Sequence, residues 1–229
     1  MTAPLTVPPV SFAAALWDMD GTLVDTEPYW IAEEQALMNA HGLSWSHADS
    51  MQLVGNELMV SAEVLRSHGL PLPAEEIVET LIAGVIERIH AHVPFRPGAR
   101  ELLRQFAQAG IPCALVTMSY RRLAAAVLHA LPGEWFAAVV PGDEVTHGKP
   151  HPEPYLRGAE LLGVAPADCL SFEDSIPGLT SAVDAGTRAF GIRHLVDLDE
   201  AAGRAVLLPS LEGVTLAELD RLAAGAAQH

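Results

Sequence analysis

Cysteine and basic residues are scarce in this chain of 229 residues. The only two cysteines, Cys113 and Cys169, each lie inside an apolar segment. This predicts buried free thiols without a disulfide framework, as is typical of a reducing, cytoplasmic compartment. Lysine and arginine together number 13 against 29 aspartates and glutamates, which gives a net charge of −16. So few basic residues argue against nucleic-acid binding, which requires neutralisation of phosphates.

Long apolar runs are also absent. No uninterrupted apolar stretch approaches the roughly 18 residues of a membrane-spanning helix. The opening MTAPLTVPPV has neither the basic nor the apolar region of a signal peptide, so we expect a cytoplasmic protein without a membrane partner. Half of the residues are hydrophobic and 18% are charged, as in an ordinary folded protein. The length allows one large core, or one domain with a smaller insertion, and we favour a monomer.

The order of apolar runs and helix-like stretches along the chain indicates the fold class. The run SFAAALW (residues 11–17) predicts a strand that is covered on both faces. Three helix-like stretches follow near residues 28–42, 56–69 and 73–92, with no convincing strand among them. The last has an apolar stripe, formed by Ile77, Leu81, Val85 and Ile89. Beyond residue 97, helices alternate with short apolar strands, which indicates βαβ units and a parallel sheet.

The predicted fold is therefore α/β, with a doubly wound parallel sheet and a small all-helical domain inserted after the first strand. We assign residues 1–27 and 95–229 to the α/β core and residues 28–94 to the helical cap. Ligands of such sheets bind outside the carboxyl ends of the strands. The polar residues that follow each apolar run are therefore the candidates for a site.

Four separate segments bring acidic, hydroxyl and amine groups to this predicted edge. The candidates are Asp18, Asp20, Thr117, Ser119, Lys149, Glu173, Asp174 and Ser175. Clustered carboxylates repel one another, and their oxygens suit a hard cation such as Mg²⁺. A divalent metal and Lys149 would together offset that repulsion.

The order of these motifs resembles that of the haloacid dehalogenase superfamily. The resemblance rests on Asp-x-Asp-Gly-Thr after a strand, Thr at the end of another, Lys-Pro in a loop and Glu-Asp-Ser at a third. It extends through RPGARELL and GKPHPEPYLRGAELLG, and so through nearly the whole chain. Within the superfamily the sequence is similar to the group of β-phosphoglucomutase and the sugar-phosphate phosphatases, and DTEPYW looks most like the hexitol or deoxysugar phosphatases.

The resemblance implies a reaction through an aspartyl phosphate, with Mg²⁺ as cofactor and a small phosphate ester as substrate. Asp18 would be the nucleophile and Asp20 the general acid and then the general base, while Thr117 and Lys149 would hold the phosphate. The implied metal ligands are Asp18, Asp20 (with its backbone carbonyl), Glu173 and Asp174. The implied substrate-binding residues are Gly21, Met118, Ser119, Glu27, Gly55 and Asn56.

Several alternatives remain open at this stage. Each motif by itself also fits a turn, a helix cap or a surface residue. Arg121 and Arg122 could face a substrate or form a solvated helix face, and His147 and His151 lack the further ligands that zinc requires.

A phosphosugar mutase is the main functional alternative to a phosphatase. The mutases that this sequence resembles carry a histidine at the position of Trp30 and cations near Val54 and Leu58, and these are absent here. A catalytically silent binding protein of the same fold is a further alternative, against which the presence of Asp18, Asp20 and Lys149 argues.

Overall fold

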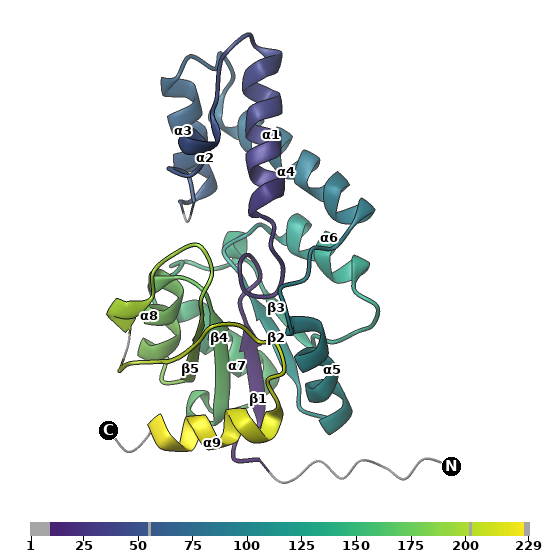
Figure 1. The fold of residues 1–229 in the computed structure, drawn as a ribbon, viewed down its shortest axis with the longest axis vertical. Coiled ribbons are helices and arrows are strands. Elements are labelled where there is room, and N and C mark those ends of the chain that lie inside the picture. The colour runs from purple at the N-terminus through teal and green to yellow at the C-terminus, as the bar shows by residue number, and fades with distance from the viewer. Residues whose placement is uncertain (1–9, 55, 202, 227–229) are drawn as a thin grey trace. The chain divides into compact units, whose positions relative to one another are not determined.

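The computed structural model describes residues 10–54, 56–201 and 203–226, which form two compact units (Figure 1). An α/β unit contains the chain up to Val24, Phe95–Arg121 and the chain from Gly133 onward. A helical unit contains Asp25–Pro94 and Arg122–Pro132. The helical unit thus begins at Asp25 rather than at residue 28, and it also includes a segment that the sequence analysis assigned to the core.

Within the described residues, six parallel strands form one sheet in the order β3-β2-β1-β4-β5-β6. The strands are β1 (Ala14–Trp17), β2 (Cys113–Val116), β3 (Ala138–Val140), β4 (Cys169–Glu173), β5 (Arg188–Ile192) and β6 (Val206–Leu208). The chain builds outward from β1 in one direction and then, from β4, in the other. This confirms the predicted doubly wound sheet, whose order reverses at β1.

Alternate residues of the central strand enter two different layers, as expected for the period of two in a strand. Ala14 and Leu16 of β1 belong to an apolar cluster with residues of α7 (Glu153–Leu162) and α8 (Ile176–Asp184). Trp17 instead contacts Phe172, with ring centroids 4.4 Å apart, and Phe106 of α5 (Ala99–Ala109). The C-terminal helix α9 (Leu216–Ala226) packs against α5 and β6. Both faces of β1 are therefore buried, which explains its continuous apolar sequence.

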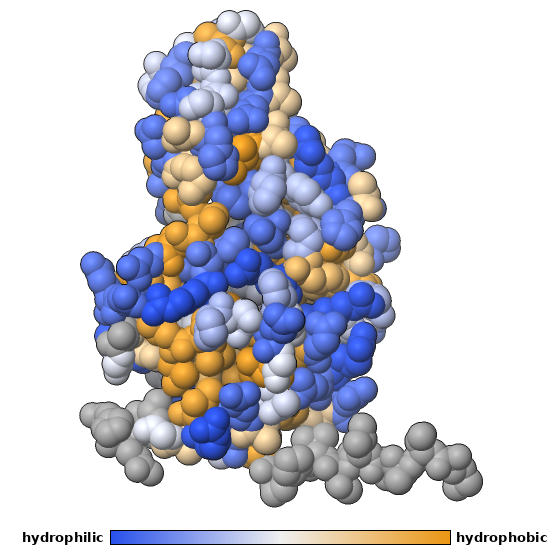
Figure 2. Space-filling view, viewed as in Figure 1, coloured by the Kyte–Doolittle hydropathy of each residue, from blue (hydrophilic) through white to orange (hydrophobic). Residues whose placement is uncertain are grey.

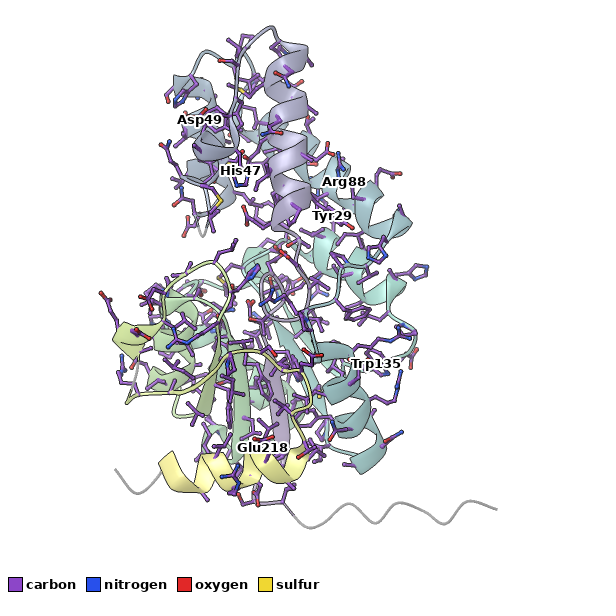
Figure 3. The ribbon with its side chains drawn as sticks, viewed as in Figure 1. Tyr29, His47, Asp49, Arg88, Trp135 and Glu218 are labelled. Atoms are coloured by element: carbon purple, nitrogen blue, oxygen red, sulfur yellow. The ribbon has the colours of Figure 1, made fainter. Side chains whose placement is uncertain are left out.

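The helical unit is built around α4 (Ala74–Ala91), which packs against α1 (Glu27–Ala40) and α3 (Leu58–Ser67). The predicted stripe is confirmed, because Ile77, Leu81, Val85 and Ile89 are all buried. Tyr29 of α1 donates a hydrogen bond to the backbone oxygen of His92, 3.1 Å away, and Arg88 forms an ion pair with Glu33 (Figure 3). Both contacts connect the C-terminal end of α4 to the N-terminal half of α1.

Two further segments complete this unit. The helix α6 (Arg121–Ala130) is tied to α4 by an ion pair of 2.5 Å between Arg122 and Glu79. The short helix α2 (His47–Ser50) was not predicted. Its N-terminus is closed by a capping box in which Ser46 and Asp49 bond each other's backbone N–H groups (Figure 3).

The surface carries both hydrophobic and hydrophilic residues. On the face in Figure 2 the hydrophobic areas are separated by hydrophilic ones. Large exposed apolar side chains occur in both units, among them Met59 in the helical unit and Leu161 and Leu195 in the α/β unit. None of the helices in the described part of the chain is long and apolar enough to cross a membrane.

Candidate active site

The first site segment is the tight turn that follows β1. Asp18 begins it, with its N–H donating to the carbonyl of Phe172 at 3.0 Å. Gly21 reverses the chain with a φ of +86°, in the left-handed region that favours glycine. A Cβ atom on Gly21 would lie 2.0 Å from Oδ2 of Asp174. The glycine therefore allows both the turn and the close approach of β1 to the end of β4.

Lys149, the only lysine in the sequence, connects three strand ends. Its Nζ lies 2.7 Å from Oδ1 of Asp18 and 2.6 Å from Oε1 of Glu173, and it donates to the carbonyl of Val116 at 2.9 Å. Burial lowers the pKa of this amine, but Asp18 and Glu173 together raise it above its ordinary value. Lys149 is therefore held as a buried cation between two carboxylates.

Glu173 is engaged by donors on both of its oxygen atoms. Oε1 accepts hydrogen bonds from Lys149 and from the phenol of Tyr155 at 2.7 Å, and Oε2 accepts from Ser175 Oγ at 3.1 Å. Tyr155 is fully buried, and the Lys149 ammonium lies 5.2 Å from the centroid of its ring. Sequence reasoning missed Tyr155, which lies in α7, six positions after Lys149. No feature of that position in the sequence marks it as a partner of β4.

Among the described residues, three acidic side chains form a close group at this edge, and two of them contact the ammonium of Lys149. Carboxylate oxygens of Asp18, Glu173 and Asp174 all lie within 4.8 Å of one another. Burial raises the pKa of Asp18 well above its usual range, Lys149 opposes this rise, and Glu173 and Asp174 add to it. Burial and the charge of Glu173 raise the pKa of Asp174 to about 7. An all-oxygen donor set with excess negative charge fits a hard divalent cation such as Mg²⁺.

Asp20 has a different environment from Asp18. Its Oδ2 accepts a hydrogen bond of 2.7 Å from the hydroxyl of Ser119, just after β2. The N–H of Ser119 in turn donates to Oγ1 of Thr117 at 3.0 Å. Among the described residues, the acidic group with metal-binding spacing does not include the Asp20 carboxylate. The side chain of Asp20 is thus held by a hydrogen bond from the β2 end.

The remaining predicted residues fall in two places. Met118 belongs to the same β2 end, where its sulfur accepts a hydrogen bond from the N–H of Lys149. Glu27 is the first residue of α1, and Asn56 is exposed just before α3, so both belong to the helical unit. Gly55 lies outside the described residues. The α/β unit alone therefore brings together the predicted residues Asp18, Asp20, Gly21, Thr117, Met118, Ser119, Lys149, Glu173 and Asp174.

The two arginines that follow the β2 segment are engaged in ion pairs. The guanidinium of Arg121 pairs with Glu144, and that of Arg122 pairs with Glu79. These contacts favour the structural interpretation of both arginines over a substrate role.

Comparison with known proteins places these residues in a family context. The model of the haloacid dehalogenase-like hydrolases matches residues 12–186. The chain is 36% identical over 189 residues to an N-acetylmuramic acid 6-phosphate phosphatase of Pseudomonas aeruginosa, covering 79% of this chain and 81% of that protein. It is 30% identical over 185 residues to hexitol phosphatase B of Escherichia coli, covering 79% and 83%.

Further matches extend this picture. The chain spans about half (49%) of a bifunctional riboflavin kinase/FMN phosphatase of Arabidopsis thaliana, with 30% identity over 189 residues and 80% of this chain covered. Among solved structures, CbbY from Rhodobacter sphaeroides in complex with phosphate superposes with a TM-score of 0.81 and 27% identity. That alignment covers 91% of this chain and 99% of CbbY.

Proposed function

The chain belongs to the haloacid dehalogenase-like hydrolase family, and we propose that it is a Mg²⁺-dependent phosphatase acting on a small sugar or polyol phosphate. The observation that carries the proposal is the position of Lys149, whose Nζ lies 2.7 Å from Asp18 beside a compact acidic group. A buried ammonium that contacts one carboxylate of such a group is suited to hold that carboxylate ionised. It is also suited to receive an anionic phosphate.

In the first step, a carboxylate oxygen of Asp18 attacks phosphorus, and the bond from phosphorus to the ester oxygen breaks. Asp20 donates its proton to the departing oxygen, so that the sugar or polyol leaves as an alcohol. In the second step, the ionised Asp20 takes a proton from water, whose oxygen attacks phosphorus. The bond between Asp18 and phosphorus breaks, and inorganic phosphate is released.

The environments of the two aspartates support these separate roles. Asp18 is buried and contacts the cation Lys149, which opposes the rise in its pKa that burial and the neighbouring carboxylates cause. Asp20 is partly exposed and accepts a hydrogen bond from Ser119. A group that exchanges protons with water and with a leaving oxygen requires this kind of access.

The metal would be held by Asp18 and Asp174, with the backbone carbonyl of Asp20. Glu173 contacts the ammonium of Lys149, the phenol of Tyr155 and the hydroxyl of Ser175, which suits it to positioning Lys149. When bound, Mg²⁺ supplies positive charge that lowers the repulsion between the carboxylates and an anionic substrate. The substrate class rests on the sugar-phosphate and hexitol phosphatases among the relatives.

A panel of phosphorylated sugars, polyols and other metabolites, assayed for phosphate release, tests this function. We expect release from a sugar or polyol phosphate with Mg²⁺ and its loss in excess chelator. Asp18→Asn is the matched control, because the amide is a poor nucleophile of the same size as the carboxylate. Full activity in chelator, or wild-type turnover by Asp18→Asn, would rule out the proposed site.

A further inference from the structure

A second group of metal-ligating side chains lies in the loop that carries Lys149. The sequence indicated no further ligand for His147 and His151, but the structure adds Glu153, and ligand atoms of the three side chains all lie within 4.8 Å of one another. Nδ1 of His147 is 2.9 Å from Oε2 of Glu153, and the rings of His147 and His151 have centroids 4.6 Å apart. None of the three side chains belongs to the acidic group at the strand ends.

The spacing of these atoms is close to that of ligands around one ion. Two ligands that each lie about 2.0–2.1 Å from a tetrahedral zinc ion are about 3.3–3.4 Å apart. Nδ1 of His147 and Oε2 of Glu153 are 2.9 Å apart because they share a hydrogen bond. Nδ1 of His151 accepts a hydrogen bond of 3.2 Å from the backbone N–H of Glu153. An ion would replace these hydrogen bonds, and the ligand atoms need move little to reach it because all of them lie within 4.8 Å of one another.

Hydrogen bonds fix the backbone of this loop (residues 146–153) before any ligand binds. The N–H groups of Thr146 and His147 donate to the two oxygen atoms of Glu153, and the carbonyl of His151 accepts from Ser181 at 2.6 Å. Pro150 and Pro152 restrict the backbone further. Preorganised ligands lose little conformational entropy on binding, which favours affinity. The His147 side chain remains 61% exposed and that of Glu153 26% exposed, so an ion can reach them from solution.

We propose that His147, His151 and Glu153 form a second metal site that binds Zn²⁺ and is separate from the phosphatase site. Two imidazoles and one carboxylate are a donor set that zinc accepts, with water in the fourth position. Imidazole favours zinc over magnesium, whereas the all-oxygen group at the strand ends favours magnesium. The two groups therefore differ in the cation that each prefers.

Calorimetric titration of the metal-free full-length chain with Zn²⁺, in an excess of Mg²⁺ that occupies the carboxylate group, tests this site. We expect one zinc ion per chain, with an affinity at least about tenfold weaker in His151→Gln and in His147→Gln. His129→Gln removes an exposed histidine outside the loop and should bind zinc like the wild type.

Two further measurements separate this site from the phosphatase site and from a folding defect. Asp174→Asn should keep the zinc affinity while it weakens Mg²⁺ binding. The melting temperatures of both histidine variants without zinc should match the wild type, because their side chains are exposed. Electron paramagnetic resonance with Cu²⁺ should report two imidazole nitrogens. Wild-type zinc affinity in both loop variants, or loss of that affinity in Asp174→Asn, would overturn the proposal.

Discussion

At the scale of single residues, the two aspartates of the first motif differ in the groups that hold them. Asp18 contacts a buried ammonium, whereas the hydroxyl of Ser119 donates a hydrogen bond to Asp20, at 2.7 Å. Ser119 was predicted to bind substrate. Its contact with Asp20 adds a positioning role, because an acid must point at the leaving oxygen to protonate it.

Ser119→Ala tests this role by removing only the hydroxyl. With a sugar phosphate, whose leaving group needs protonation, we expect kcat to fall by about tenfold, the equivalent of one hydrogen bond of about 1.4 kcal/mol. With an aryl phosphate, whose leaving group needs little protonation, kcat should hardly change. Steady-state kinetics on both substrates gives the comparison. An equal loss on both would indicate instead that Ser119 contacts the phosphate.

At the scale of elements, the turn after β1 decides whether the carboxylates of two strands can approach. Gly21 and Gly110 both have left-handed φ angles, +86° and +68°. A Cβ at Gly21 would meet Asp174 Oδ2 at 2.0 Å, whereas a Cβ at Gly110 would meet nothing within 4 Å. Substituting each of these two glycines by alanine therefore separates two losses of stability. One comes from the left-handed backbone conformation, and the other from the close approach of Asp174 to position 21.

Gly110→Ala should lose about 1–2 kcal/mol of unfolding free energy, because the left-handed backbone conformation is sterically unfavourable for alanine. The variant should keep its activity, because the added Cβ meets no neighbouring atom. Gly21→Ala should lose more stability, and it should also lose Mg²⁺-dependent activity, because Asp174 must move. Denaturant unfolding and phosphatase assays on both variants measure the two effects. Equal stability losses with activity intact in both would contradict the packing argument.

At the scale of the whole molecule, the acidic group links stability to pH and to metal. Asp174, one of the three carboxylates of this group, has a pKa of about 7 in the folded chain and about 3.9 in the unfolded chain. Between these values the folded state binds a proton that the unfolded state does not. The metal-free protein therefore loses this contribution to its unfolding free energy as pH rises through that window.

The proposed Mg²⁺ would bind the ionised carboxylate and so compete with this proton. We expect the rise in melting temperature on adding Mg²⁺ to be small at about pH 5.5 and larger at about pH 8. Thermal unfolding with Mg²⁺ and with chelator at both pH values gives the comparison. Asp174→Asn should show little Mg²⁺ effect at either pH. A larger Mg²⁺ effect at the lower pH would contradict the shifted pKa.

The outcome of the whole reaction separates the phosphatase from the mutase alternative. The resemblance implies that the mutases carry a histidine at the position of Trp30 and two cations near Val54 and Leu58, and this sequence has none of the three. Without those cations a sugar bisphosphate intermediate should not be retained. We expect phosphate release from sugar or polyol phosphates and no conversion of β-glucose 1-phosphate to glucose 6-phosphate. A coupled assay with a bisphosphate primer measures this, and robust glucose 6-phosphate formation with little phosphate release would identify a mutase.

The sequence by itself determined the features that depend on short-range pattern. Alternating apolar runs and amphipathic stretches predicted the parallel sheet and the helical insertion, since strand and helix periods are local properties. The burial of the α4 stripe followed in the same way. The strand-end positions of Asp18, Thr117 and Glu173 placed the candidate site, because parallel strands end at one edge.

Only the tertiary structure decided which partners those residues have. Tyr155 reaches Glu173 from α7, and Ser119 reaches Asp20 from the end of β2, although neither pair is close in sequence. The ion pair from Arg122 to Glu79 likewise ties α6 to α4 within the helical unit. Such pairings depend on how distant elements pack, and a hydroxyl or a carboxylate has the same local pattern whichever partner it finds. The periodicity of a sequence therefore predicts elements and their edges, while packing assigns the hydrogen bonds that set the chemistry.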